Sequence, residues 1–399
     1  MPIFLGARGE DVLSRQGTAD FLARLRRDLH GRMAHLPPGE ELALLEGVAG
    51  TLRDEIAFEE RFYAEVGREV AAIDEAGDAE GLAVPLQRLR DMVADYFRRR
   101  GSVAACHLVC TAVTDRAAAA AFRLARPLPS VPWCLMGVGA AGRGEGTLFS
   151  LGDFLLVHGA EGDEGEAVTA FAGQGAEILC DLGLADRSGV LPSLPAWRGS
   201  MAEWRTRIAT RLAEGDGDLE GLIRLADLRL VAGDASLAAG MVNLVRAMLG
   251  YHQDAVREAA RRTAMMPSGF DFFGRFRVER GGAHRGEFNL GLYGVEPLVA
   301  IVRVLTVRFD IPESGTVERI RGLLQGGRID VELAEQLLFA WHALGKFALA
   351  EEIARGGRAS GMFISPSTLA VDEQEELKRG LEAVGTLQKM VYSSMAGQG

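Results

Sequence analysis

A glycine-rich segment lies between two short apolar runs and limits the folds open to this chain. The run Trp133–Val138 overlaps Gly137-Val-Gly-Ala-Ala-Gly142, and after eleven further residues the run Phe154–Val157 follows. Short apolar runs bounded by glycine are typical of buried strands, whereas a helix needs a longer periodic segment. The pattern therefore predicts two strands joined by a glycine-rich turn, which is a hairpin.

The spacing of these glycines also fits G-x-G-x-x-G, the fingerprint of dinucleotide-binding sites. That fingerprint requires a helix that begins at the second glycine, so that the pyrophosphate meets the helix N-terminus. Here Arg143-Gly-Glu-Gly-Thr-Leu-Phe-Ser-Leu-Gly152 follows, with three more glycines, and no ribose-binding acid ends a second strand. A dinucleotide-dependent enzyme is the weakest interpretation, and a hairpin after Gly142 would exclude it.

Apolar periodicity divides the chain into three parts. Before the proline-rich segment Arg126–Pro132, and again from Ala235 onward, apolar residues recur at helical spacing. Between them we expect helices at Ala167–Leu182 and after Ser200, where Glu203 completes a capping box, and a strand at Ile223–Leu230. The prediction is an α+β fold with a helical N-terminal region (1–128), a small mixed-sheet core (129–234) and a helical C-terminal domain (235–399).

The N-terminal region contains a long amphipathic stretch with an apolar face from Leu45 to Ile73 and a charged opposite face, typical of a solvated surface. Two further helices are predicted at Leu86–Arg99 and Ser102–Leu124. Helical bundles of this kind commonly dimerise, so we expect a homodimer through these helices.

Composition excludes several classes of partner. The formal net charge of -11 argues against sequence-independent binding of nucleic acid, which requires a dense basic surface. No apolar run is long enough to span a membrane, and the start MPIFLGARGEDVL reaches charge too soon for a signal peptide. The four cysteines lack CxxC pairing and are expected to be buried thiols rather than metal ligands. We expect a cytoplasmic protein.

The second interpretation of the glycine-rich segment is the hairpin of a nucleotidyltransferase. Such enzymes join a nucleoside monophosphate to a hydroxyl by in-line attack on the α-phosphate, with two divalent ions held by three carboxylates. Two of the carboxylates must share one face of a strand, which requires the spacing Asp-x-Asp. A glycine-rich turn before the pair allows backbone N–H groups to approach the triphosphate.

Residues 139–157 support this interpretation with a specific resemblance. The segment Gly139-Ala-Ala-Gly-Arg-Gly-Glu-Gly-Thr-Leu-Phe-Ser-Leu-Gly-Asp-Phe-Leu-Leu-Val157 is similar to G-S-x-x-R-x-E-x-T-L-x-[ST]-D-x-D-x-x-L-[IV]. That pattern marks a bacterial nucleotidyltransferase family, related to the uridylyltransferase that modifies the PII nitrogen-signalling protein and often fused to CBS or cyclic-nucleotide-binding domains. Further similarities follow in order, at Ala196–Arg205, Ala226–Asp234, Phe270–Phe276, Pro297–Arg303 and Thr316–Arg319.

The resemblance implies a role for each matching residue. Asp153 corresponds to the second aspartate of the pair and Asp227 to the third carboxylate, so both are expected to be catalytic and to hold Mg²⁺. The residues expected to contact a nucleoside triphosphate are Gly139, Ala140, Arg143, Glu145 and Thr147.

This chain departs from the pattern at positions where the chemistry takes place. Leu151 stands where the family has the first aspartate, Ala140 replaces a serine, and Asn289-Leu-Gly291 replaces Asp-Leu-Lys. Leucine cannot ligate a metal ion, and two carboxylates hold two ions poorly.

For several of these residues the sequence allows more than one role. Arg143 fits a phosphate contact or a salt bridge to Glu145, and Asp227 fits a metal ligand or an ion pair with Arg229. His158 can replace a lost ligand, although a lone histidine there is more often an ordinary surface or core residue. His284 on its glycine-rich loop can contact substrate.

We therefore expect a nucleotidyltransferase-superfamily protein that is catalytically weakened or inactive and acts as a nucleotide-binding or protein-binding signalling module. The rival is a working enzyme, similar to the PII uridylyltransferase, that transfers a nucleoside monophosphate to a protein or a small acceptor. In that case Glu161 or Asp163 would substitute for the missing aspartate.

Overall fold

The computed structural model describes residues 25–26, 29–33, 36–37, 39–159, 165–214, 219–356 and 362–396. They fall into two compact units, Met1–Ala120 and Ala121–Gly399. Each unit is described by itself.

The first unit is helical, as predicted. Its elements are α2 (Glu41–Glu75), α3 (Ala79–Arg100) and α4 (Val103–Leu124), whose last turn extends past Ala120. The Asp78 side chain caps α3 by accepting from Gly81 N at 2.8 Å, and Gly101 ends that helix in the left-handed conformation. The C-terminal half of α2 is buried against α3, whereas the N-terminal half of α2 extends beyond it.

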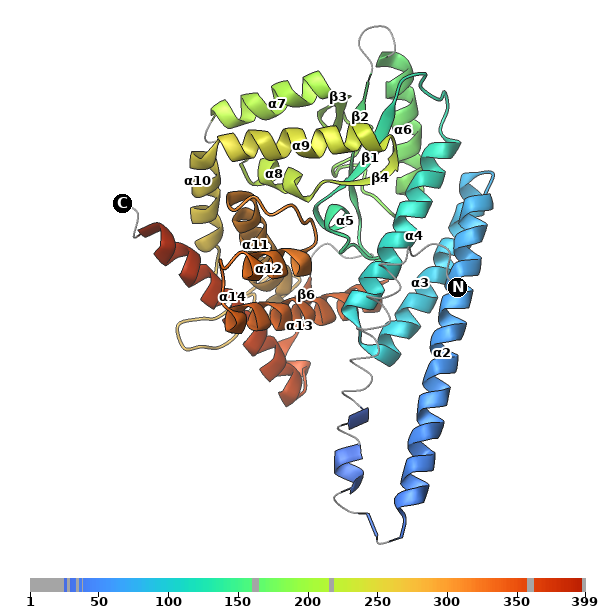
Figure 1. Cartoon of the computed structure of the whole chain (residues 1–399), viewed down its shortest axis with the longest axis vertical. Helices are drawn as coiled ribbons and strands as arrows, with labels where there is room; N and C mark the ends of the chain where they lie inside the picture. The colour runs from blue at the N-terminus through green and yellow to red at the C-terminus, as the bar shows by residue number, and fades with distance from the viewer. Residues whose placement is uncertain are drawn as a thin grey trace. The chain divides into compact units, whose positions relative to one another are not determined.

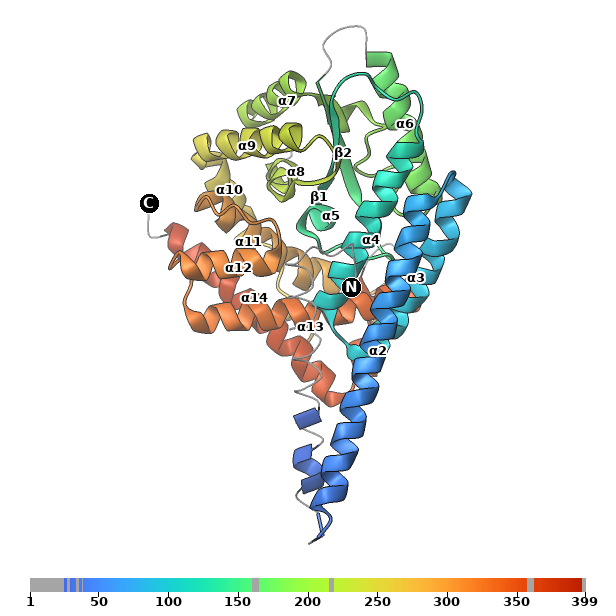
Figure 2. The same ribbon diagram turned by 45° about the vertical axis from the view of Figure 1, so that its right-hand side comes forward.

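The second unit is built on a mixed four-stranded sheet with the order β3-β2-β1-β4. The strands are β1 (Trp133–Val138), β2 (Asp153–His158), β3 (Arg198–Ser200) and β4 (Arg229–Gly233). The strands β1 and β2 are antiparallel, from Trp133 opposite His158 to Val138 opposite Asp153, and they lie side by side in Figures 1 and 2. The predicted hairpin and the predicted α+β class are confirmed.

Helices surround this sheet and continue to the C-terminus. They are α5 (Gly139–Arg143), α6 (Gly165–Asp181), α7 (Met201–Glu214), α8 (Leu219–Ile223), α9 (Ala235–Tyr251), α10 (Gln253–Ala264), α11 (Glu296–Arg308), α12 (Thr316–Gln325), α13 (Val331–Arg355) and α14 (Val371–Ala396). A two-stranded sheet, β5 (Phe288–Asn289) with β6 (Phe363–Ile364), lies among the C-terminal helices. No helix in the described ranges combines the length and the apolar character that a membrane span needs.

One predicted feature of the hairpin was wrong. Its turn contains a short helix, α5, which begins at the second glycine, Gly139. Gly142 allows this turn to pack closely, because a β-carbon there would lie 2.1 Å from the carbonyl oxygen of Asp227. Since β2 then returns antiparallel to β1, the segment is not the strand–helix–strand crossover of a dinucleotide site.

The strand predicted at Ile223–Leu230 was also wrong in its position, because the observed strand β4 spans Arg229–Gly233. The helix α8 ends at Ile223, a 3-10 turn covers Arg224–Asp227, and only Arg229 begins β4, opposite Gly137 of β1. The apolar residues of this segment are buried because the turn packs against the core, not because the backbone is extended.

The capping box at the start of α7 is confirmed. Ser200 N donates to Glu203 Oε2 at 2.6 Å, and Glu203 N donates to Ser200 Oγ at 3.3 Å. The indole of Trp204 then donates to the carbonyl oxygen of Leu156 in β2 at 3.4 Å, which fixes α7 against the sheet. One hydrophobic core extends from β1 and β2 through α9, α10 and α11 to α14.

Candidate functional site

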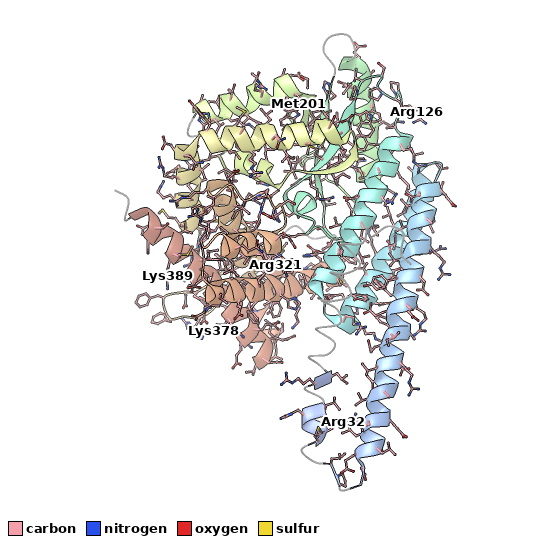
Figure 3. The ribbon with its side chains drawn as sticks, viewed as in Figure 1. Arg32, Arg126, Met201, Arg321, Lys378 and Lys389 are labelled. Carbon is pink, nitrogen blue, oxygen red and sulfur yellow. The ribbon has the colours of Figure 1, made fainter. Side chains whose placement is uncertain are left out.

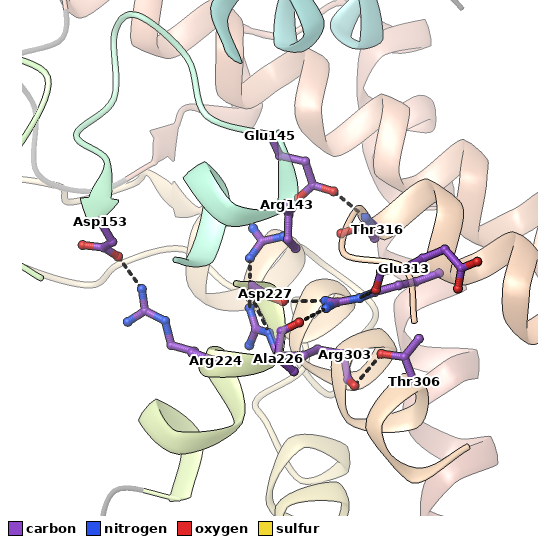
Figure 4. A network of polar contacts seen from close by, with 11 residues as sticks. Arg143, Glu145, Asp153, Arg224, Ala226, Asp227, Arg303, Thr306, Glu313 and Thr316 are labelled. Carbon is purple, nitrogen blue, oxygen red and sulfur yellow. Dashed lines mark hydrogen bonds and ion pairs between the residues drawn. The ribbon is translucent and has the colours of Figure 1, made fainter. Parts of the chain in front are cut away.

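The hairpin brings together a glycine, an aspartate and an arginine. Asp153 begins β2, and its Oδ2 accepts from Arg224 Nη2 at 2.5 Å (Figure 4). Gly139 has a positive φ of 59°, and a β-carbon there would lie 2.9 Å from the same Nη2. The absence of a side chain at Gly139 therefore allows the guanidinium of Arg224 to reach the aspartate.

The donors at this place do not fit a two-ion centre. The carboxylate of Asp153 is paired with a guanidinium, and Leu151, two residues earlier, presents a half-exposed apolar side chain. In the described part of the chain, no three His, Cys, Asp or Glu side chains are grouped so that they could hold a metal ion. Two-ion phosphoryl chemistry needs several oxygen ligands around each ion.

Asp227 lies in a different environment. It ends the 3-10 turn before β4, is completely buried, and contacts three guanidinium groups (Figure 4). Arg143 Nη1 and Arg303 Nη2 approach Oδ2 at 2.9 and 2.8 Å, and Arg319 Nη1 approaches Oδ1 at 2.5 Å. Both carboxylate oxygens are thus occupied by cations of the protein itself.

Burial alone would raise the pKa of the Asp227 carboxyl. The guanidinium groups of Arg303, Arg143 and Arg319 outweigh that effect and lower the pKa to about 2. Arg229, the ion-pair partner considered from the sequence, donates to the carbonyl oxygen of Ala141 at 2.9 Å.

The motif residues on the loop before β2 contact C-terminal helices. Arg143 Nε donates to Glu145 Oε2 at 2.6 Å, which is the salt bridge considered from the sequence. The other oxygen, Glu145 Oε1, accepts from the backbone N–H of Thr316, the first residue of α12, at 2.7 Å. Thr147 Oγ1 donates to Glu352 Oε2 of α13 at 2.6 Å. These side chains therefore join the hairpin to the C-terminal helices.

Charge and burial reinforce these contacts. Burial raises the pKa of the Glu145 carboxyl, but Arg143 and the Thr316 hydrogen bond outweigh it, so the net pKa is lowered. Burial raises the pKa of Glu352, and the hydrogen bond from Thr147 only partly offsets this. At neutral pH the Asp227 and Glu145 groups are therefore anions within a buried arginine cluster.

Sequence reasoning missed the cationic partners of both aspartates. Arg303 and Arg319 lie within segments that resemble the family, but the sequence pattern does not indicate that they contact a carboxylate. Arg224 and Glu352 carried no signal in the sequence. The partners are far apart along the chain, and only the fold brings them together.

The histidines considered from the sequence lie elsewhere. His158 ends β2, is buried, and lines a polar cavity of about 350 Å³ with Arg198 and Arg207. Burial lowers its pKa. His284 Nδ1 is 2.6 Å from Glu287 Oε2, and its ring stacks on Phe363 at 3.7 Å. Glu161 and Asp163 lie outside the described residues.

Lysine does not contribute to either aspartate cluster. The lysines of the chain are Lys346 on α13 and Lys378 and Lys389 on α14, of which the last two are labelled in Figure 3. The positive charge around both aspartates comes from arginine alone, which forms the planar, forked contacts seen at Asp227.

The hairpin on a small mixed sheet, joined to a helical C-terminal region, defines a nucleotidyltransferase-like core. Residues 87–218 match the family model "Putative nucleotidyltransferase DUF294", and residues 253–395 match "Putative nucleotidyltransferase substrate binding domain". The chain belongs to this nucleotidyltransferase family. No curated protein matches the sequence.

Proposed function

We propose that this protein is a nucleotidyltransferase-family module in which nucleotidyl transfer is lost or strongly weakened, and which acts in signalling by binding a nucleotide or a protein. The observation that carries the proposal is the guanidinium of Arg224 on the carboxylate of Asp153, beside Gly139 and two residues from Leu151. A fixed monovalent cation there competes with any divalent ion for the remaining carboxylate of the hairpin.

The same arrangement supports nucleotide binding without catalysis. Arg224 is partly exposed. Its guanidinium hydrogen-bonds to Asp153 and interacts electrostatically with the nearby carboxyl of Glu296. Its other N–H groups can donate to a phosphate, which is the preferred partner of an arginine fork. We therefore expect a nucleoside triphosphate to bind with little dependence on Mg²⁺.

The rival function, an active enzyme, has one feature in its favour. A β-carbon at Gly189 would lie 3.7 Å from Asp153 Oδ1 and 3.6 Å from the β-carbon of Asp186, so both acids approach the same point. In an active enzyme, Asp186 would supply the second carboxylate of the metal site. It joins Glu161 and Asp163 as a candidate to replace the aspartate that is missing at Leu151.

A transfer assay separates the two functions. The protein is incubated with each radiolabelled nucleoside triphosphate, Mg²⁺ or Mn²⁺ and a cell extract, beside Leu151→Asp, Asp153→Ala and Asp186→Asn. We expect no transfer by the wild type and a gain with Leu151→Asp. Transfer by the wild type that is lost in Asp153→Ala would overturn the proposal, and loss in Asp186→Asn would identify the substitute ligand.

Equilibrium binding tests the nucleotide part directly. A fluorescent triphosphate is titrated with EDTA or with Mg²⁺, for the wild type, Arg224→Gln and the exposed control Arg321→Gln on α12. We expect similar affinities in both buffers and weaker binding for Arg224→Gln alone. Strict dependence on Mg²⁺ would contradict the proposal.

The expected homodimer remains part of this proposal, and the N-terminal half of α2, which extends beyond α3, supports it. Arg99 and Arg100, at the end of α3, contact Glu55, so α2 before that residue extends past its neighbour. In that half of α2, apolar residues recur at alternating spacings of three and four residues, as they do in the apolar seam of a coiled coil. Its members are Leu42, Leu45, Ala49, Leu52 and Ile56, of which Leu42, Leu45 and Ile56 are more than half exposed.

Charge favours a second copy in antiparallel orientation. If two seams cross at Ala49, Glu46 of each copy faces Arg53 of the other, whereas a parallel pair sets Glu41 beside Glu46. Light scattering coupled to gel filtration should give a dimer for the wild type and a monomer for Leu45→Glu. The control Thr51→Glu, off the seam, should remain dimeric, and a monomeric wild type at micromolar concentration would exclude this interface.

A further inference from the structure

The helices α8, α10 and α11 line a cavity of about 230 Å³, and its lining residues include neither Asp153 nor Arg224. Its wall is mostly apolar and is formed by Leu219, Ile223, Ala259, Met266, Ala300 and Val304. Among the residues that the structure describes, the polar lining consists of Thr263 and the charged side chains of Glu220, Arg262 and Arg303. Of these three charged residues only Arg303 is buried, with 6% of its surface exposed.

Arg303 belongs to a cluster with more positive than negative charge. Three guanidinium groups, of Arg143, Arg303 and Arg319, are paired with two carboxylates, of Asp227 and Glu145. Burial and the two neighbouring arginines lower the pKa of Arg303, whereas Asp227 raises it, with a net lowering. A buried charge without a full partner is costly, so an additional anion at this place is favourable.

The geometry of Arg303 leaves one edge of its guanidinium available. The Nε and Nη2 groups both approach Asp227 Oδ2, at 2.9 and 2.8 Å, which uses the side-on fork. The third nitrogen, Nη1, forms no hydrogen bond with any residue that the structure describes. Since Arg303 lines the cavity and its fork is directed at Asp227, we infer that Nη1 is the donor offered to the cavity.

The size and lining of the cavity define the ligand. The volume lies below the range of about 300–1,000 Å³ usual for drug-sized ligands, so the ligand is small. The apolar wall requires an apolar body, and the single buried cation requires one anionic group. Glu220, exposed on the same lining, disfavours a second negative charge.

We propose that this cavity binds a small monocarboxylate with a branched or aromatic apolar body, whose carboxylate pairs with Arg303. Bound there, the anion supplies the negative charge that the Asp227 cluster lacks and stabilises the junction of α8, α10 and α11. This site does not depend on whether the hairpin transfers or merely binds nucleotides.

Isothermal titration and thermal unfolding of the full chain test the site. The probes are benzoate, phenylacetate, isovalerate and indole-3-carboxylate, beside the neutral isostere benzamide, all at constant ionic strength. At least one carboxylate should bind saturably with one equivalent and raise the melting temperature, whereas benzamide should do neither. Absence of saturable binding by every carboxylate, or equal binding of benzamide, would overturn the proposal.

Matched variants locate the binding. Ala259→Leu fills the cavity, whereas Ala255→Leu, one turn earlier on α10, lies outside the lining. Arg262 lines the cavity, whereas Arg261 does not. Both arginines pair with Glu258 and are similarly exposed, so Arg261 is the matched control for Arg262. Ala259→Leu should abolish binding, and Arg262→Gln should weaken it about two- to five-fold, as expected of a solvent-screened charge.

The controls Ala255→Leu and Arg261→Gln should bind like the wild type. Circular dichroism establishes that each variant is folded. Retention of full affinity by folded Ala259→Leu would place the ligand elsewhere and reject this cavity.

Discussion

The surroundings of Asp153 and Asp227 differ more than their positions in the sequence pattern suggest. Asp153 begins a strand at a partly exposed place and pairs with one arginine, which is itself partly exposed. Asp227 is fully buried and is held by three arginines from three other parts of the chain. In the pattern both are carboxylates of one metal centre. In this structure the first remains accessible to a ligand, whereas the second connects the sheet region to the C-terminal helices.

Loss of charge at the two aspartates should therefore have very different effects on stability. Asp227→Asn leaves three buried guanidinium groups without their shared anion, and we expect a loss of about 3–5 kcal/mol in the free energy of unfolding. Asp153→Asn breaks a partly exposed pair and should cost about 1 kcal/mol or less. Urea unfolding followed by tryptophan fluorescence measures both. Equal losses would show that the two environments do not differ as described.

Glu145 tests whether the loop side chains have a structural role. Its carboxylate accepts from Arg143 and from the N–H of Thr316. Glu145→Gln keeps the shape but removes the charge, and the expected loss is about 1.5–3 kcal/mol, as for hydrogen bonds to charged groups. The same urea series gives the value, with the exposed Glu318→Gln on α12 as a control near zero. If Glu145→Gln is as stable as that control while nucleotide binding is lost, Glu145 is a ligand contact instead.

The pH dependence of the free energy of unfolding, compared between the wild type and Asp227→Asn, should reveal the contribution of the Asp227 carboxylate. Its pKa falls from 3.8 in the unfolded chain to about 2 in the folded protein. A lowered carboxyl pKa stabilises the fold above the unfolded value, and that contribution, about 2 kcal/mol, is lost as the pH falls from 3.8 towards 2. The difference in unfolding free energy between the wild type and Asp227→Asn should therefore shrink by that amount between pH 5 and pH 2. A constant difference would exclude the lowered pKa.

The fold was predictable where the signal is local. Helical periodicity gave the N-terminal and C-terminal helices, and the pair Ser200 and Glu203 gave the start of α7. The short helix α5 and the turn at Arg224–Asp227 were missed because one helical turn is too short to show a period. Such turns are specified by packing, as at Gly142, and not by the pattern of apolar residues.

The candidate site was predictable only in part, for a related reason. The motif located Asp153, Arg143, Glu145 and Thr147, but not Arg224 and Glu352, which contact Asp153 and Thr147. Asp227 is separated from Arg143, Arg303 and Arg319 by 84, 76 and 92 positions along the chain. A family pattern identifies a carboxylate, but it cannot show whether the fold surrounds that carboxylate with water or with arginine.

The smallest expected effect is that of Thr147→Val, and its pH dependence has the opposite sign to that of Asp227. The hydroxyl donates to Glu352, whose pKa is raised from 4.5 mainly by burial. A raised carboxyl pKa contributes stability below the unfolded value, and this contribution is lost as the pH rises through the folded pKa. Removing the hydrogen bond to the anion raises that pKa further, so the valine variant should lose about 1 kcal/mol at pH 8 and less at pH 4. Urea unfolding at the two pH values, with Thr386→Val on the exposed face of α14 as the control, measures the difference. A penalty that is equal at both pH values, or larger at pH 4, would mean that Glu352 is not the partner through which Thr147 acts.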